Sequence, residues 1–196
     1  MRRTFRSPFV RLVAGAWLAT SVNACVAAEW AVDADHVSIY FAASHFDISY
    51  VHGRFAKITA AVQFDPDAKT GQAVVTVDAD SIDTGNRTLD GILRSSQFLD
   101  TVANPEIRYV SSQFVFAGDR LVAVDGTVWL HGVQRPLRLD AERFTCKDVA
   151  AGIVSQHRCG GAFHAVLKRS EFGMTRFLPD VGDDIKLDIG VEATRR

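Results

Sequence analysis

Six histidines are the side chains of this sequence that most directly suggest catalysis or metal binding. They are His36, His45, His52, His131, His157 and His164. None stands at H-x-H, H-x-x-x-H or H-E-x-x-H spacing, at which a strand or a helix presents two imidazoles to one ion. We therefore predict that the histidines act independently, as polar or half-buried side chains, and that they form no metal site.

Motifs for nucleophilic catalysis and for cofactor binding are missing from the sequence. There is no G-x-S-x-G nucleophile elbow, no phosphate-binding loop and no dinucleotide fingerprint. Asp78, Asp80, Asp83 and Asp90 are close in sequence, but alternate carboxylates on a strand usually face water. We predict no catalytic residue, no cofactor and no enzymatic activity.

Two cysteines, Cys146 and Cys159, flank a polar segment over residues 147–158. The glycine and the polarity of this segment predict a connection between two strands. In an oxidising compartment such a pair is most simply a disulfide, which is our prediction. A metal-binding pair is the alternative, but the chain has no C-x-x-C motif and only His157 lies between the two cysteines.

The N-terminus has the layout of a secretory signal. Four arginines precede an uncharged run over residues 12–22, and small residues at 24–28 precede the first acid, Glu29. The run is too short to span a bilayer, which needs about 20 apolar residues. We predict a signal peptide over residues 1–28, cleavage before Glu29 and a periplasmic location. A lipoprotein signal, with Cys25 as the lipidated first residue, is the weaker alternative.

Charge and composition limit the partners and the number of domains. Residues 29–196 hold 18 basic and 23 acidic residues, a balance poorly suited to binding a phosphate backbone. The chain has 196 residues and is 47% hydrophobic, so that a single core suffices. We predict one domain over residues 29–196 and no nucleic-acid partner.

The elements that must position any site are mostly strands. Apolar residues alternate with polar ones in eight segments, and the short connections between them are typical of an antiparallel sandwich or barrel. The segments are 37–43, 58–64, 73–79, 107–116, 122–130, 137–141, 163–167 and 185–191.

One segment has helical spacing instead. Leu89, Ile92 and Leu93 stand at i, i+3 and i+4, and Asn86 or Thr84 can cap the start of this helix. We predict a short helix over one end of the sheet. A second helical turn is predicted over residues 170–174, with Ser170 as its cap.

The strand pattern does not decide whether the interior is hollow. Several inward positions are small, which favours a cavity: Ala43, Ala60, Ala73, Ala79, Ala141 and Ala165. Against this, eleven phenylalanines in residues 29–196 can fill the interior. A barrel of eight strands is at the boundary between a packed core and a core that holds one small ligand.

A series of short motifs runs in order along the chain. They are Asp33-x-x-His36-x-x-Ile39-x-Phe41; His45; Gly53-x-Phe55; Ser81-Ile82-x-Thr84-Gly85; Asp90-x-x-Leu93-x-Ser95-x-x-Phe98-Leu99-Asp100; Pro105-x-Ile107-x-Tyr109; Gly126-x-Val128-x-Leu130-His131-Gly132-Val133-x-x-Pro136; Lys168-Arg169-Ser170-x-Phe172-Gly173-Met174; and Val181-Gly182-Asp183. Together they resemble the YceI-like family of lipid- and polyisoprenoid-binding proteins. The chain departs from the family at Val37, where members often have Ser or Thr, and in the cysteine-flanked segment, which many relatives lack.

The resemblance implies an all-β fold, a single eight-stranded antiparallel lipocalin-like barrel with one short helix over an end. It also implies non-enzymatic binding, transport or storage of an isoprenoid-type or other long-chain amphiphile in the periplasm. Some relatives are associated with membrane b-type cytochromes, so such a cytochrome is a candidate partner. The alternatives are an enzyme that acts on a lipid or quinone through His45 or His131, and a ligand-free envelope stress protein.

Apolar-inward alternation predicts which residues line the pocket of such a barrel. From the strands these are Ile39, Phe41, Val62, Val75, Val77, Tyr109, Val128, Leu139 and Phe163. Leu93, Phe98 and Phe172, on the helical segments, are predicted to cover its ends. His45 and Arg169, which match family motifs, are predicted to lie nearest the head group of the ligand.

Overall fold

The computed structural model describes residues 28–196, which form eleven strands, one α-helix and three short 3-10 helices. The predicted signal peptide and Cys25 lie outside the described residues, except for Ala28. The strands are β1 (Ala28–Val32), β2 (Ser38–His45), β3 (Ser49–Phe55), β4 (Ile58–Asp65), β5 (Thr70–Asp78), β6 (Ile82–Asp83), β7 (Glu106–Ala117), β8 (Arg120–Leu130), β9 (Val133–Ala151), β10 (Val154–Lys168) and β11 (Val181–Arg195). The helices are η1 (Ala34–His36), η2 (Ala79–Ser81), α1 (Arg87–Arg94) and η3 (Arg169–Phe172). No helix among the described residues is long and apolar enough to cross a membrane.

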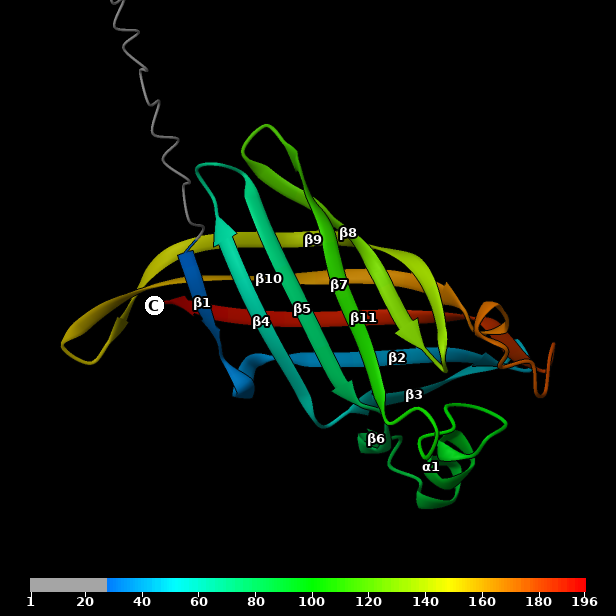
Figure 1. Cartoon of the computed structure of the whole chain (residues 1–196). Helices are drawn as coiled ribbons and strands as arrows, with labels where there is room; N and C mark the ends of the chain where they lie inside the picture. The colour runs from blue at the N-terminus through cyan, green and yellow to red at the C-terminus, as the bar shows by residue number, and fades with distance from the viewer. Residues whose placement is uncertain (1–27) are drawn as a thin grey trace, which may run out of the picture.

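The strands close into the predicted eight-stranded antiparallel barrel (Figure 1). The ring runs β1-β4-β5-β7-β8-β9-β10-β11, and β1 closes it because it pairs with both β4 and β11. Trp30 stands opposite Val62 on β4 and opposite Arg195 on β11. Closure leaves β1 with neighbours on both sides, which satisfies its backbone groups.

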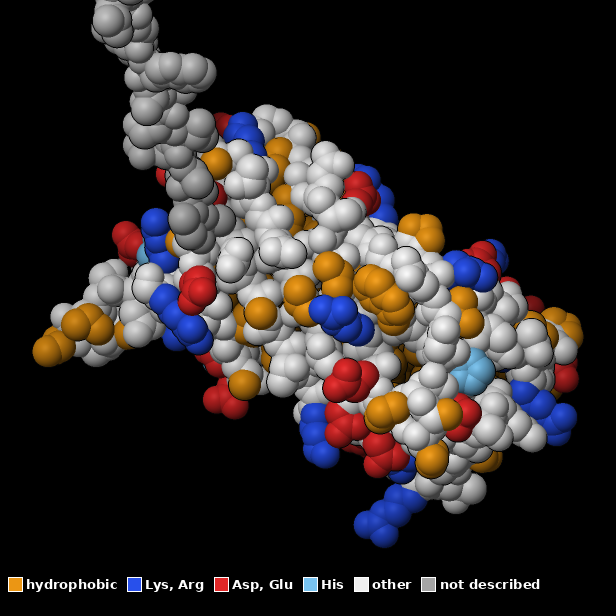
Figure 2. Space-filling view, viewed as in Figure 1, with side chains coloured by type: hydrophobic (Ala, Val, Ile, Leu, Met, Phe, Trp, Pro, Cys, Tyr) orange, Lys and Arg blue, Asp and Glu red, His pale blue; other side chains and the backbone are white. Residues whose placement is uncertain are grey.

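Three further strands extend this ring at the end where α1 lies. β2 continues along β11 after the η1 turn, β3 pairs with β2, and the two-residue β6 pairs with β3. In Figure 1, α1 lies at this end and the tip of the β9–β10 hairpin projects from the other. Figure 2 shows hydrophobic side chains exposed at this tip, where Ile153 and Val154 lie. The sequence did not predict β3, because this strand is mostly exposed and its pattern has few apolar residues.

The connection predicted over residues 147–158 is wrong. β9 and β10 continue through it as a two-stranded ribbon, paired as far as Ala151 and Val154, with Gly152 in the left-handed conformation of the turn. The ribbon extends beyond the barrel and encloses no core along its length. Its sequence therefore lacks the apolar alternation by which the other strands were predicted.

The predicted helix and its cap are confirmed in α1. The Asn86 side chain accepts hydrogen bonds from the backbone N–H groups of Thr88 and Leu89, which would otherwise have no partner in the first turn. Thr84 has a different role, because its N–H and hydroxyl both donate to the buried carboxylate of Asp90. These contacts fix α1 across one end of the barrel.

The second helical turn begins one residue earlier and ends two residues earlier than predicted. η3 covers residues 169–172, and the residue at its N-cap position is Lys168, whose side chain makes no capping bond. Ser170 instead donates two hydrogen bonds, from its N–H and its hydroxyl, to the two oxygens of the Asp183 carboxylate. Both donor–acceptor distances are 2.8 Å. The serine predicted as a helix cap therefore ties η3 to β11.

Aromatic side chains fill the end of the barrel remote from α1. Phe64 stacks on Phe114 and Phe116 and meets the edge of Phe144, with ring centroids 5.5 to 6.4 Å apart. The Trp30 indole joins this cluster and donates to the carbonyl of Phe64. Several of the phenylalanines that could have filled the whole interior are thus concentrated at one end.

Candidate functional site

A cavity of about 510 Å³ occupies the α1 end of the barrel. Its walls are almost wholly aliphatic and aromatic, because alternate residues of each strand face inward. On neighbouring strands, Val75 stands opposite Tyr109 and Val77 opposite Ile107, so that these pairs form a continuous apolar wall. A volume of this size is typical of small-molecule sites.

Most residues predicted for the pocket do line this cavity. From the strands these are Ile39, Phe41, Val75, Val77, Tyr109, Val128 and Leu139; Leu93, Phe98, His45 and Arg169 complete the set. The structure therefore brings together segments that are far apart in the sequence. Their contact with a ligand stays a prediction.

Three predicted residues lie away from the cavity lining. Val62 packs against Trp30 and Phe64 at the far end, because it stands opposite Trp30 in the pairing of β1 with β4. Phe163 and Phe172 face inward but belong to the packed core rather than to the cavity wall, and Phe172 is 1% exposed. Inward direction alone could not separate a position on the wall from one in the packed part.

Two glycines let aromatic rings lie flat along the barrel wall. The Tyr109 ring covers Gly126 on the adjacent strand, and the Phe41 ring covers Gly53. The Tyr109 hydroxyl donates a hydrogen bond of 2.9 Å to the Val124 carbonyl. Burial raises the pKa of Tyr109, so this phenol stays neutral and adds no charge to the cavity.

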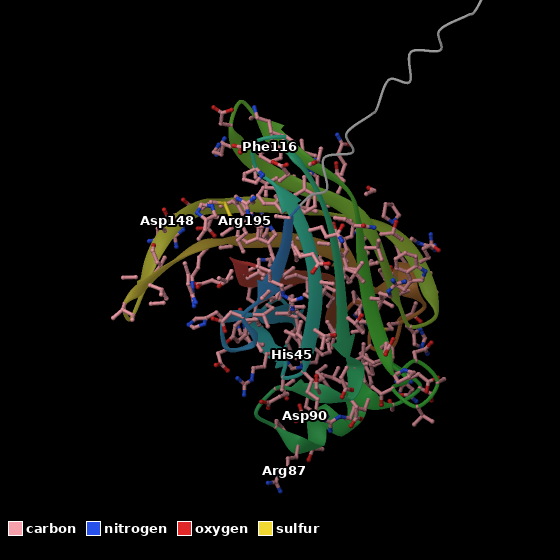
Figure 3. The ribbon with its side chains drawn as sticks, turned by 60° about the vertical axis from the view of Figure 1, so that its left-hand side comes forward. His45, Arg87, Asp90, Phe116, Asp148 and Arg195 are labelled. Carbon is pink, nitrogen blue, oxygen red and sulfur yellow. A yellow bond between two sulfur atoms is a disulfide. The ribbon has the colours of Figure 1, made fainter. Side chains whose placement is uncertain are left out.

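The cavity reaches solvent beside α1. Phe46, Phe177 and Ile92 all line it, yet 55%, 47% and 41% of their surfaces are exposed. His45 and Asp180 lie at the same place and supply polar groups. Figure 3 shows His45 and Asp90 at this end of the molecule, with Phe116 and Asp148 toward the opposite end. The mouth of the cavity, defined by Phe46, Phe177 and Ile92, is apolar with a few polar groups.

Arg169 serves as the anchor of the chain around the mouth. It is 3% exposed and donates four hydrogen bonds of 2.6 to 2.9 Å to the carbonyls of Met174, Arg176, Val181 and Gly182. Its guanidinium also lies 5.9 Å from the centroid of the Phe98 ring. The residue predicted to face a head group thus binds the backbone of the segment that shapes the mouth.

His131 has a comparable structural contact. Its Nδ1 lies 2.7 Å from the Phe172 carbonyl, which can only accept, so Nδ1 carries the proton and donates. This bond joins the β8–β9 turn to η3. It occupies one nitrogen of an imidazole considered above as an acid–base group.

Several residues of the cavity carry no pattern by which the sequence could have identified them, or only a weak one. Phe46, Phe177 and Asp180 lie in loops, where no periodicity marks an inward face. Val51 lies on β3, a strand that was not predicted. Leu89 stands one turn before Leu93, and the helical spacing already noted could have placed it in the lining.

The predicted disulfide joins Cys146 and Cys159 at the far end of the barrel. The two residues are direct partners across β9 and β10, and Cys159 is buried beside Trp30 and Ala193. The bridge fastens the β9–β10 ribbon where it leaves the barrel. It lies outside the cavity lining.

Comparison with protein families agrees with this architecture. The YceI-like domain matches residues 30–193, which is almost the whole described chain. A UPF0312 protein of Serratia proteamaculans is 30% identical over 187 residues, covering 94% of this chain and 95% of the relative.

Solved structures give the same result. The YceI protein of Campylobacter jejuni is 28% identical, with a TM-score of 0.65 over 78% of this chain and 90% of that one. A domain from Saccharophagus degradans, described as polyisoprenoid binding and implicated in plant cell wall breakdown, shares the fold with a TM-score of 0.61. It is 15% identical, and the match covers 87% of this chain and 99% of that one.

Proposed function

This chain belongs to the YceI-like family, and we propose that it binds the apolar chain of one amphiphilic lipid inside its barrel. The observation that carries the proposal is the cavity of about 510 Å³ between the barrel wall and α1. Each buried methylene of a ligand would contribute roughly 0.8 kcal/mol to binding. The cavity needs few polar groups for such a ligand, and it has few.

The position of the mouth suits a ligand with a polar head. Aromatic packing around Phe64 fills the far end, so the ligand enters beside α1 and its tail points toward Phe64. His45 and Asp180 at the mouth are the polar groups nearest the head. Arg169 acts there through the carbonyls that it binds, by holding the mouth in shape.

The finer assignment is an isoprenoid-type or other long-chain amphiphile that the protein carries or stores without chemical change. The fold is shared with a domain described as polyisoprenoid binding, and a branched apolar tail suits walls of valine, leucine and isoleucine. The family and its binding-domain neighbour favour a binding protein over an enzyme. A membrane b-type cytochrome stays a proposed partner in the handling of such a lipid.

The proposed location is the periplasm. It is supported by the basic, apolar and small-residue order of residues 1–28. Mass measurement of the exported protein should find Glu29 as the first residue. A lipidated Cys25 would contradict the soluble form and place the protein on a membrane.

Ligand capture is the direct test of the function. Mass spectrometry of organic extracts from natively purified protein should find one long-chain lipid, and Val77→Asp or Val128→Lys should abolish its retention. A charge at either position would lie in an apolar wall without a partner. Val166→Asp is the matched control, because Val166 is 55% exposed on the outer face of β10.

The folded state of each variant must be confirmed by circular dichroism. A folded Val77→Asp protein that retains the same lipid in the same amount would show that the cavity is not the site. Wild-type protein that carries no lipid, and binds no polyprenyl or fatty chain when offered one, would contradict the proposed function.

A further inference from the structure

One face of the β9–β10 ribbon carries four residues with metal chemistry. Cys146 stands opposite Cys159, and Asp148 opposite His157, in the register of the two strands. Residues two apart on a strand face the same side, so all four side chains share one face. The sulfur atoms of the two cysteines and a ring nitrogen of His157 lie within 4.8 Å of one another. Figure 3 shows Asp148 beside the disulfide, far from His45 at the cavity mouth.

These side chains match the ligand set of a zinc site. Two thiolates and one imidazole are ligands that zinc prefers, and a water molecule can take the fourth tetrahedral position. Asp148 Oδ1 lies 2.8 Å from His157 Nδ1 and so orients the ring. A carboxylate in this position is the usual supporting partner of a zinc-bound histidine. Because Nδ1 of His157 contacts this carboxylate, Nε2 is the nitrogen left for the metal.

We propose that reduction of the Cys146–Cys159 disulfide converts this face into a zinc site. A dithiol reductant supplies two electrons and two protons, the S–S bond breaks, two thiols form, and the reductant becomes a disulfide. Zinc(II) then displaces the two thiol protons to water and forms two Zn–S bonds, with His157 Nε2 as the third ligand. In the reverse step a protein disulfide accepts two electrons from the two thiolates and, with two protons from water, becomes two thiols, while the Cys146–Cys159 bond reforms and the zinc ion is released.

The surroundings of the site allow both steps. Asp148 is 73% exposed and His157 is 37% exposed at the side chain, so that a metal ion can reach the face from solvent. Cys159 is buried against Trp30, and the Trp30 ring centroid lies 5.8 Å from that of His157. The site and the lipid cavity lie at opposite ends of the barrel, so either can be tested without the other.

Cobalt(II) titration tests the proposal, because cobalt replaces zinc in such sites and gives thiolate-to-metal charge-transfer absorption. The mature protein is reduced with a phosphine, freed of excess reductant without oxygen, and titrated. We expect one equivalent of cobalt to bind with this absorption, zinc to displace it, and the oxidised protein to show none. Reduced protein that keeps its circular dichroism and shows no such absorption would overturn the proposal.

Variants distinguish a metal site that includes His157 and Asp148 from binding by the two thiols alone. His157→Ala should weaken cobalt binding by at least tenfold, and Asp148→Asn by roughly tenfold to a hundredfold. His164→Ala is the matched control, because His164 stands opposite Asp140 on the same two strands, away from the cysteines. Equal affinities of the His157→Ala and His164→Ala proteins would show that the histidine is no ligand.

A further variant covers the case in which reduction loosens the fold. Cys146→His cannot form the disulfide but keeps Cys159, His157 and an added imidazole on the same face. It should bind cobalt in air without a reductant, with the charge-transfer absorption of a single thiolate. Failure of this folded variant to bind would overturn the proposal whatever the behaviour of the reduced wild type.

Discussion

The ring of Tyr109 on β7 lies against the backbone of Gly126 on β8, so close that a β-carbon at residue 126 would collide with it. The same ring lines the lipid cavity, and its hydroxyl is bonded to the carbonyl of Val124. Gly126 thus gives the ring its room, and the hydroxyl fixes its direction. One residue without a side chain thereby determines the shape of a cavity wall.

Gly126→Ala should lower the free energy of unfolding by roughly 1–3 kcal/mol, because the added methyl group would also meet the carbonyl of Val110, which cannot move freely. Urea denaturation followed by circular dichroism measures the change. Gly91→Ala is the control, since a β-carbon in this position of α1 meets nothing within 4 Å. It should stabilise the protein by up to about 1 kcal/mol. Equal stabilities of wild type and Gly126→Ala would show that Tyr109 can move aside without cost.

Arg169→Met should destabilise the protein by about 3 kcal/mol or more, since four carbonyls would lose a charged donor. Arg169→Lys should recover little, because an ammonium cannot reproduce the planar fork of the guanidinium. Urea denaturation of both variants checks this. Arg120→Met, at an exposed position, should change stability by no more than about 0.5 kcal/mol. An Arg169→Lys protein as stable as wild type would contradict the anchoring role.

The Asp183 carboxylate should contribute stability that depends on pH. Burial raises its pKa, but the bonds from Ser170 and the nearby Lys168 and Arg169 outweigh burial and hold the pKa below the usual value. A lowered pKa in the folded state means that this stability is complete above the unfolded pKa of about 3.9, and that it is lost as pH falls through the folded value.

Asp183→Asn should therefore lower stability by roughly 1–2 kcal/mol at neutral pH. The difference in stability between the variant and wild type should become smaller below about pH 4. Thermal unfolding between neutral and acid pH measures both, with the exposed Asp188→Asn on the same strand as control. A gap that does not change with pH would show that the charge of Asp183 is not the cause.

The disulfide should resist alkylation and should stabilise the fold. In protein from an oxidising compartment, neither Cys146 nor Cys159 should react with a thiol reagent until it is reduced. Replacing both by alanine should cost about 3 kcal/mol, since the bridge closes a loop between residues 13 apart in sequence. Denaturant unfolding of the double variant measures this. Full alkylation of both thiols without reduction would contradict the bridge.

Period-two alternation predicted eight strand cores, and seven of the nine strand residues that it assigned to the pocket do line the cavity. This worked for strands such as β5 and β7, because each has one face on the apolar interior and one on water. Helical spacing and the Asn86 cap predicted α1, because both signals depend only on residues within the helix and its first turn. The expected oxidising compartment and the two cysteines outside the signal predicted the pairing of Cys146 with Cys159 without any knowledge of the register.

Tertiary structure alone decided where the interior is hollow. Phe64, Phe114 and Phe116 gather at one end because strand pairing sets Phe64 on β4 opposite Gly71 on β5, beside the Phe114 ring of β7. The other end is left to smaller side chains around Val75 and Val77. Alternation reports only whether a side chain faces inward. Its height along the barrel depends on strand register and tilt, which pairing between distant segments sets.

The sequence could not predict the contacts of Arg169 or the shared face of the β9–β10 ribbon, because both depend on pairing between distant segments. Arg169 binds carbonyls that belong to residues 174–182, and carbonyls are common to every residue type, so no side-chain pattern marks its partners. Asp148 meets His157 because the ribbon continues past the barrel in register. The sequence determined which residues can form strands and bonds, whereas long-range pairing determined which of them meet, because only the closed barrel fixes distances between remote segments.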